Sequence, residues 1–270
     1  MGVLSPVNVN EMRLNLRDKV VVVTGGAQGI GEAIVRGCAE EGALPVIVDR
    51  DEHGLTILRE DLSQAGLMSE AVVVDLVDTA ESYSAIQDVA KRLGRIDGLV
   101  NNAGVNDGVG LERGSPDLFL ASLQKNLVHY FTAVQAVLPY LKISSGSIVN
   151  IGSKVAITGQ GGTSGYAAAK GAIFELTGAW AEELSPSGIR VNAVIPAEVE
   201  TPQYMSWLAR LENPQQELVK IASKVPLGHR LTNPREIAAM VIFLLSSKCS
   251  LNGQNVFVDG GYAHLDRRAT

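Results

Sequence analysis

The chain has 270 residues, of which 46% are hydrophobic and 19% charged, and these proportions exclude a globally disordered protein. Its 29 acidic and 23 basic side chains give a formal net charge of −6, so we expect no nucleic-acid partner. No apolar stretch reaches the roughly 18 residues that cross a bilayer, and the N-terminus lacks the pattern of a secretory signal. We therefore expect a cytoplasmic protein with no membrane partner.

Seven short apolar runs, rich in valine and isoleucine, recur along the chain. They are residues 19–26, 43–49, 70–76, 96–104, 146–153, 188–196 and 253–261. Their apolar residues are continuous rather than alternating, which is typical of strands covered on both faces. Helix-like segments lie between them, at residues 31–42, 83–94, 123–142, 165–184 and 234–246. This alternation predicts a single doubly wound, Rossmann-type α/β domain over residues 16–270, with about seven parallel strands flanked by helices. We expect residues 1–15 to form a flexible leader and 262–270 a C-terminal tail.

A glycine-rich turn follows the first apolar run, in the stretch TGGAQGIG that ends at Gly31. Its spacing is GxxxGxG, which differs from the general dinucleotide fingerprint GxGxxG. Glycines let a backbone approach a diphosphate closely, and the start of the following helix offers free N–H groups and positive potential. A purely structural turn is the alternative, but the position after the first strand favours nucleotide binding.

The second and third apolar runs end in acidic residues. Asp49 lies where a carboxylate can accept hydrogen bonds from the adenosine ribose and repel a 2′-phosphate, which favours NAD over NADP. Arg50 follows at once and could pair with that phosphate instead, so NADP stays possible. Asp75 could accept a hydrogen bond from the adenine amino group. The stretch NNAG at residues 101–104 should meet the cofactor at the same sheet edge.

A tyrosine and a lysine four residues apart, Tyr166 and Lys170, begin one helix-like segment. The ammonium group of a lysine one helical turn away can lower the pKa of a phenol, which is otherwise about 10, toward the working range of a base. Taken alone, this spacing often arises by chance and is more typical of a solvated helix face. Ser153, thirteen residues before Tyr166 at the end of a strand, could hold a substrate oxygen beside the phenol. Asn126 could hold a water beside Lys170.

These motifs, in this order and spacing, resemble those of the short-chain dehydrogenase/reductase family over about residues 16–262. The resemblance implies that Tyr166 acts as the base in oxidation and the acid in reduction, and that Ser153 orients the substrate oxygen. It further implies that Lys170 binds the nicotinamide ribose and lowers the pKa of Tyr166, and that Asn126 anchors a proton-relay water. The residues expected to bind the cofactor are Gly25, Gln28, Gly29, Ile30, Gly31, Asp49, Arg50, Asp75, Leu76, Asn102, Ala103, Gly104, Tyr166, Lys170, Pro196, Val199 and Thr201. The chain departs from the family at Ala197, where a glycine is usual, and at Gly152, where a serine is usual.

Three segments that follow the fourth, fifth and sixth strands should face the substrate. They are polar, as a pocket for several hydroxyls requires, whereas a steroid or fatty-acyl pocket should be mainly apolar. The expected substrate residues are Asn106, Ser153, Lys154, Gln160, Tyr166, Glu198, Tyr204 and Trp207. The segments also resemble those of one subgroup of the family, the bacterial L-fucose dehydrogenases. That resemblance implies oxidation of the anomeric hydroxyl of a free aldose, L-fucose or a relative, to a lactone.

Two other functions stay open. One is a 3-oxoacyl carrier-protein reductase or general ketoreductase of the same family, which would need NADPH and a basic docking patch. The other is a dinucleotide sensor without catalysis. The four histidines have no zinc-binding spacing, so no metal site is expected, and Cys38 and Cys249 are expected to be buried thiols. The family resemblance implies a homo-oligomer, with a tetramer favoured, built by the helices at 123–142 and 234–246 and by the last strand.

Overall fold

The computed structural model describes residues 14 and 16–265, and seven strands in that part of the chain form one parallel sheet. The strand order is β3-β2-β1-β4-β5-β6-β7. The strands are β1 (Val20–Thr24), β2 (Leu44–Asp49), β3 (Glu70–Val73), β4 (Gly98–Asn101), β5 (Ser147–Ile151), β6 (Arg190–Pro196) and β7 (Asn255–Val258). Each lies within its predicted apolar run, which confirms the doubly wound fold. The chain order reverses between β1 and β4, and in such sheets ligands bind beyond the carboxyl ends of the strands at this point.

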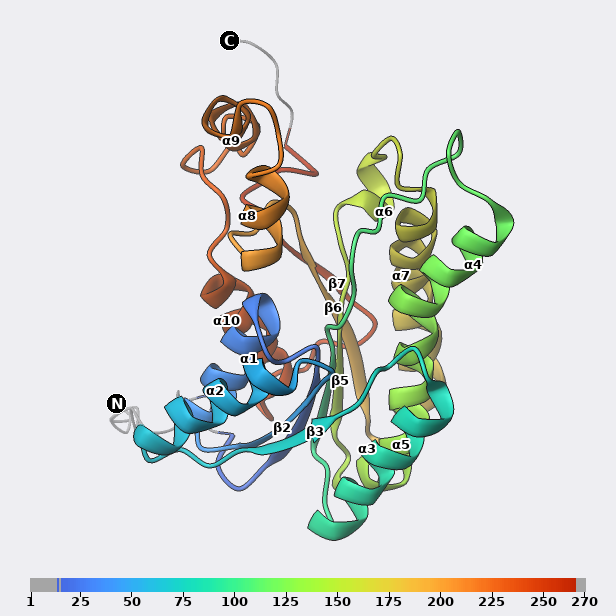
Figure 1. Ribbon diagram of the computed structural model, residues 1–270. Helices are drawn as coiled ribbons and strands as arrows, with labels where there is room; N and C mark the ends of the chain where they lie inside the picture. Colours follow the sequence, from blue (N-terminus) through green and yellow to red (C-terminus); the bar gives the residue numbers. More distant parts are fainter. Residues whose placement is uncertain (1–13, 15, 266–270) are drawn as a thin grey trace, which may run out of the picture.

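Helices cover both faces of the sheet (Figure 1). The helices α1, α2 and α10 contribute to one buried apolar cluster, and α3, α5 and α7 contribute to the other. Successive valines of β1 alternate between them: Val21 and Val23 join the first cluster, and Val20 and Val22 the second. The helices are α1 (Gly29–Glu40), α2 (Glu52–Gln64), α3 (Thr79–Leu93), α4 (Pro116–Leu123), α5 (His129–Ser144), α6 (Val155–Thr158), α7 (Ser164–Leu184), α8 (Pro202–Leu208), α9 (Pro214–Ala222) and α10 (Pro234–Leu245). Two apolar layers on one sheet explain why its strands carry apolar residues on both faces.

The five predicted helices are present, but the structure adds five that the apolar pattern did not indicate: α2, α4, α6, α8 and α9. They are short or mostly polar; α9 has no buried residue. The predicted helix at 123–142 is also not uniform. It begins as the last residue of α4, passes through a π-helical segment at Gln124–Val128, and continues as α5.

Most of the expected leader lies outside the described residues, as do residues 266–270 of the expected tail. Two residues of the N-terminal region are described: Leu14 packs against the first apolar cluster, and Leu16 is fully buried in it. The first residues of the expected tail are held in place, because the Asp259 carboxylate accepts hydrogen bonds from the backbone N–H groups of Gly261 and Ala263, both at 2.8 Å. Among the described residues, no helix is long and apolar enough to cross a membrane.

Candidate active site

A cavity of about 1500 Å³ lies beyond the carboxyl ends of the strands, where the chain order reverses. Pockets for single small ligands usually measure about 300–1000 Å³, so there is room for a dinucleotide together with a substrate. The predicted site residues come together here. Every predicted cofactor or substrate residue lines the cavity except Gly31, and of the four predicted catalytic residues Asn126 alone stays behind the wall.

The glycine turn forms a cradle against the start of α1. Gly25 has a φ of +63°, and a Cβ atom there would lie 2.8 Å from the Cα atom of Ala103. A Cβ atom on Gly31 would lie 2.0 Å from the carbonyl oxygen of Gly25, so any side chain there would push the turn out of place. The Asn102 amide ties the turn to the end of β4 by donating to the carbonyl oxygens of Thr24 and Gly25, at 3.0 and 2.9 Å. No side chain caps α1, which leaves its first N–H groups available. The cradle therefore fits a diphosphate.

Two carboxylates, Asp49 and Asp75, line the end of the cavity that is expected to hold adenosine. Asp49 accepts hydrogen bonds from the backbone N–H groups of Ala27 at 3.0 Å and Asp51 at 3.1 Å, so its position at the end of β2 is fixed. Arg50 does not stand free beside it, because its guanidinium forms an exposed ion pair with Asp75, with 3.5 Å between nitrogen and oxygen. The Asp49 carboxylate is therefore fixed at this end of the cavity. The neighbouring Arg50 is already paired with Asp75.

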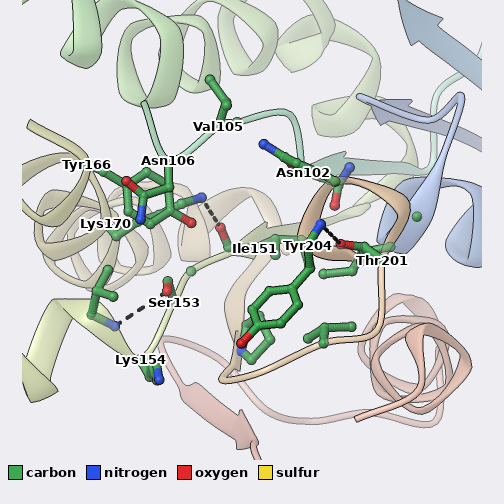
Figure 2. A pocket seen from close by; sticks show the side chains of 18 of the residues that line it. Asn102, Val105, Asn106, Ile151, Ser153, Lys154, Tyr166, Lys170, Thr201 and Tyr204 are labelled. Carbon is green, nitrogen blue, oxygen red and sulfur yellow. Dashed lines mark hydrogen bonds between the residues drawn. The ribbon is translucent and has the colours of Figure 1, made fainter. Parts of the chain in front are cut away.

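Ser153, Tyr166 and Lys170 share one wall of the cavity (Figure 2). Lys170 is buried, and its ammonium donates to the carbonyl oxygen of Ile151 at 2.8 Å and to the hydroxyl of Tyr130 at 3.2 Å. The Tyr130 hydroxyl in turn donates to the same carbonyl oxygen at 3.1 Å. The Lys170 nitrogen lies 5.6 Å from the centre of the Tyr166 ring. Tyr130 is a neighbour that the sequence did not single out, since it lies forty residues away on α5.

The pKa of Tyr166 differs from the expectation. Burial raises it to about 12, against the smaller lowering effect of the hydrogen bond with Ser153. Burial also lowers the pKa of Lys170 to about 7. This direction is opposite to the expected lowering of the Tyr166 pKa. The reason is that burial of the phenol outweighs the hydrogen bond with Ser153, while Lys170 directs its own hydrogen bonds at Ile151 and Tyr130.

Asn126 lies in the π-helical segment, and π-helical turns occur often at functional sites. Its side chain is buried and bridges two elements. The amide nitrogen donates to the carbonyl oxygen of Ser122 at 2.9 Å, and the amide oxygen accepts from the backbone N–H of Val105 at 2.7 Å. Asn126 therefore fixes the loop that follows β4 through its contact with Val105.

The predicted substrate residues meet at the other end of the cavity. Lys154 and Glu198 form an ion pair, and the rings of Tyr204 and Trp207 pack edge to face with centroids 5.3 Å apart. Asn106 and Gln160 are exposed at its rim. Tyr262, which sequence reasoning assigned to a loose tail, also lines the cavity, and its ring centre lies 3.8 Å from the Lys154 nitrogen.

His129 is a second residue of the wall that sequence reasoning did not place there. It is 1% exposed, its Nε2 atom bonds the carbonyl oxygen of Lys125 at 3.0 Å, and its buried Nδ1 atom has no hydrogen-bond partner among the described residues. Burial lowers the pKa of His129 from 6.5 to about 4. The folded protein therefore keeps this imidazole neutral.

We expect His129 to make the protein sensitive to acid. Because its pKa is lower in the folded than in the unfolded chain, its contribution to stability is complete above pH 6.5 and is lost as the pH falls toward 4. The loss should approach about 3 kcal/mol, since each pKa unit corresponds to about 1.4 kcal/mol. In the His129→Gln variant this loss should vanish, so the free energies of unfolding of wild type and variant, measured in urea at pH 8 and pH 5, should converge or cross at pH 5. His53 is exposed on α2 and provides the control. The difference in free energy of unfolding between wild type and His53→Gln should be the same at pH 8 and pH 5.

Among the described residues no group of three or more histidine, cysteine or acidic side chains is placed to hold a metal ion. Cys38 and Cys249 are free and buried, as predicted.

The comparisons with known sequences agree with this geometry. The family model described as short chain dehydrogenase matches residues 19–212. The L-fucose dehydrogenase of Rattus norvegicus is 35% identical over 244 residues, which cover 90% of this chain and 88% of that protein. The 3-oxoacyl-[acyl-carrier-protein] reductase of Thermotoga maritima is also 35% identical, over 250 residues that cover 92% of this chain and 99% of that protein.

Solved structures give the same result. The Cj0485 dehydrogenase is 42% identical with a TM-score of 0.90, and the match covers 96% of this chain and 99% of that one. The aldohexose dehydrogenase of Thermoplasma acidophilum is 29% identical with a TM-score of 0.85, covering 94% and 98%. The 3-ketoacyl-(acyl-carrier-protein) reductase of Brucella melitensis, solved with NADH, is 29% identical with a TM-score of 0.81, covering 92% and 100%. Because the family model matches most of this chain, the chain belongs to the short-chain dehydrogenases and is an NAD(P)-dependent oxidoreductase of that family.

Proposed function

We propose that this enzyme oxidises a free aldose, L-fucose or a stereochemical relative, at its anomeric carbinol and gives a lactone, with NAD as the hydride acceptor. The observation that carries the proposal is the substrate end of the cavity. There a largely buried ion pair joins Lys154, the residue after Ser153, to Glu198, and Glu198 shares a hydrogen bond with the hydroxyl of Tyr204. Such a wall offers donors and acceptors to several hydroxyls, whereas an acyl chain would cover these charged and polar groups without offering them hydrogen bonds.

In this proposal each residue of the wall has one task. Tyr166 takes the proton of the anomeric hydroxyl, and Ser153 donates to the same oxygen and holds it in place. The glycine cradle and Asp49 would hold NAD, which when bound would supply the hydride acceptor. Lys170 supports the phenolate, and Asn126 keeps the loop after β4 in position through its bond with Val105. Because burial holds the proton on Tyr166 in the ligand-free enzyme, oxidation should depend on groups that stabilise the phenolate, and Lys170 is the cation in reach.

The proposed preference for NAD depends on Asp49. In the Asp49→Asn variant, the ratio of kcat/KM with NADP to that with NAD should rise at least about 10-fold, because the like-charge repulsion of the 2′-phosphate is removed. Asparagine keeps an oxygen for the N–H group of Ala27, so the turn should stay intact. Asp51→Asn removes the same charge two residues away, outside the cavity wall, and should leave the ratio unchanged. An Asp49→Asn enzyme with an unaltered ratio would contradict the assignment.

A panel of substrates tests the proposed activity. Steady-state rates should be measured on free aldoses, including L-fucose and D-arabinose, and on polyols with NAD and with NADP, and on simple ketones and a 3-oxoacyl thioester with NADH and with NADPH. We expect turnover of at least one aldose with NAD. Turnover of the thioester with NADPH and of no sugar would instead assign the enzyme to the 3-oxoacyl reductases, a class that the relative from Thermotoga maritima represents at equal identity.

We also propose that the enzyme acts as a homotetramer. Two features support this: β7 is an edge strand, and Phe131, on α5, is 50% exposed and packs on Trp180. Light scattering coupled to gel filtration measures the mass directly. A monomer at micromolar concentration would refute the proposal.

A further inference from the structure

The ion pair between Lys154 and Glu198 is unusual in its burial. The side chains are 11% and 13% exposed, yet both line the cavity that must admit the substrate. Lys154 directly follows Ser153, and its backbone N–H donates to the carbonyl oxygen of Pro196 at 2.9 Å, which ties the end of β5 to the segment that carries Glu198. The pair is therefore held beside the reacting end of the cavity by two neighbouring strands.

Aromatic residues surround the pair. The Lys154 ammonium lies over the Tyr262 ring, and Tyr204 shares a hydrogen bond with Glu198. Burial, followed by the charge of Glu198, raises the pKa of Tyr204, so this phenol stays neutral. These contacts occupy one side of each charged group with protein atoms. Lys154, Glu198 and Tyr204 also line the cavity, where Figure 2 labels Lys154 and Tyr204.

The other charged groups of the wall lie apart from this pair or are screened. Asp49, Arg50 and Asp75 stand at the adenosine end. Lys125 pairs with Asp107 at 3.7 Å. Lys224, which follows α9, is exposed to solvent, where charges are screened by water and salt. Lys170 also lines the wall beside Ser153, but its ammonium is directed at the Ile151 carbonyl oxygen and the Tyr130 hydroxyl. Beyond Lys170, the charge that a substrate meets next to Ser153 is set by Lys154 and Glu198, and their sum is zero.

An ion pair that is largely buried in the cavity wall discriminates by charge. The hydroxyl groups of a polyhydroxy substrate can donate hydrogen bonds to the Glu198 carboxylate and accept them from the Lys154 ammonium. These hydrogen bonds replace those that each charged group makes with water. A substrate that carries a carboxylate would bring a third charge into this region, and the Lys154 ammonium is already neutralised. Burying a charge without a partner is costly, so the anion is rejected.

We propose that the Lys154–Glu198 pair is a charge filter that admits uncharged polyhydroxy substrates and rejects their carboxylic acid counterparts, with Glu198 as the residue that determines this specificity. The inference rests on the proposed function and deepens it. It concerns the charge of the substrate and not the position of its reacting carbon.

The test compares two substrates that differ by one charge: a neutral aldose that the enzyme turns over, and the uronic acid of the same configuration. In wild type, kcat/KM should favour the neutral sugar. In Glu198→Gln, which leaves Lys154 without its anion, the acid-to-neutral ratio of kcat/KM should rise at least about 10-fold, as expected for gaining one charged hydrogen bond. The change should fall mainly on KM, because the proton-transfer groups are untouched.

Glu200→Gln is the matched control, since this glutamate is exposed two residues further along and does not line the cavity. It should leave the ratio unchanged. A second variant reverses the sign of the test: Lys154→Met leaves the Glu198 charge unpaired and should favour a protonated amino sugar over the neutral one by at least about 10-fold. This variant decides the case if Glu198→Gln fails to fold.

Unchanged ratios in both variants, with cofactor affinity retained, would overturn the charge filter. So would an equal shift in Glu200→Gln. If wild type turns over no aldose, the proposed function fails, and the same comparison is then made with the neutral ketone or alcohol it does turn over and the corresponding acid. If the acid-to-neutral ratio of kcat/KM changes there in Glu198→Gln, the charge filter is supported although the proposed sugar substrate is wrong.

Discussion

Replacing Tyr166 with phenylalanine should lower kcat/KM by about 1000-fold or more, within the range that a general acid–base group contributes. The variant removes one oxygen atom from the wall that Ser153 and Lys170 share, and phenylalanine keeps the ring that packs there. Nicotinamide cofactor should still bind, with a dissociation constant within about 3-fold of wild type, because Lys170 and the glycine cradle are unchanged. Initial rates and a fluorescence titration with NADH measure the two quantities separately.

Tyr140→Phe is the matched control, since Tyr140 lies on α5 and outside the cavity wall. Its activity should equal that of wild type. A Tyr166→Phe enzyme that retains a tenth of the wild-type rate would show that another group transfers the proton, and the assignment of Tyr166 would have to be withdrawn.

The second large effect is expected at Gly31. In Gly31→Ala, the added methyl group would lie 2.0 Å from the carbonyl oxygen of Gly25, far inside van der Waals contact, so the turn or the start of α1 must move. We expect cofactor affinity to fall by about 100-fold, equivalent to about 2.7 kcal/mol, and the free energy of unfolding to fall by about 1–3 kcal/mol, as in other overpacked sites. Isothermal titration with NAD and unfolding in urea measure the two losses.

The same substitution at Gly178 provides the comparison. This glycine is exposed on α7, and a Cβ atom there would have no atom within 4 Å. Alanine should stabilise the helix by up to about 1 kcal/mol and leave cofactor binding unchanged. If Gly31→Ala bound NAD as wild type does, the glycine cradle would not be the diphosphate site.

The strands could be predicted because each one is an apolar run bounded by polar or glycine residues. Parallel strands covered on both faces must be apolar throughout, so β1, with four consecutive valines, is visible in the sequence. The helices that were not predicted are short or mostly polar and give no such signal. Helix α2 buries leucines at positions 55, 58 and 62, a helical spacing that could have revealed it, whereas α9 buries none. The π-helical segment depends on hydrogen bonds that no spacing encodes.

The candidate site was predictable where its residues follow strands in sequence, because the ends of parallel strands meet at one edge. Ser153 and Asp49 are examples, and the lysine spacing from Tyr166 fixes one helix face. Tyr130 and His129 could not be found in this way. Their positions depend on how α5 packs against β5 and α7, which is a property of the tertiary structure. The ligand-free pKa of Tyr166 escaped prediction for the same reason, since burial outweighs the nearby cation.

The cavity wall joins residues from both ends of the described chain: the turn at Gly25 and the segment from Tyr262 to Leu265, which Asp259 holds in place. During synthesis, residues as late as Leu265 must therefore have left the ribosome before the cavity wall is complete. The β1–α1 unit, in contrast, is complete once Glu40 has been made. A protease that removed only Tyr262 and the residues after it would spare both apolar clusters, so we expect a folded product that keeps the glycine cradle and lacks part of the cavity wall.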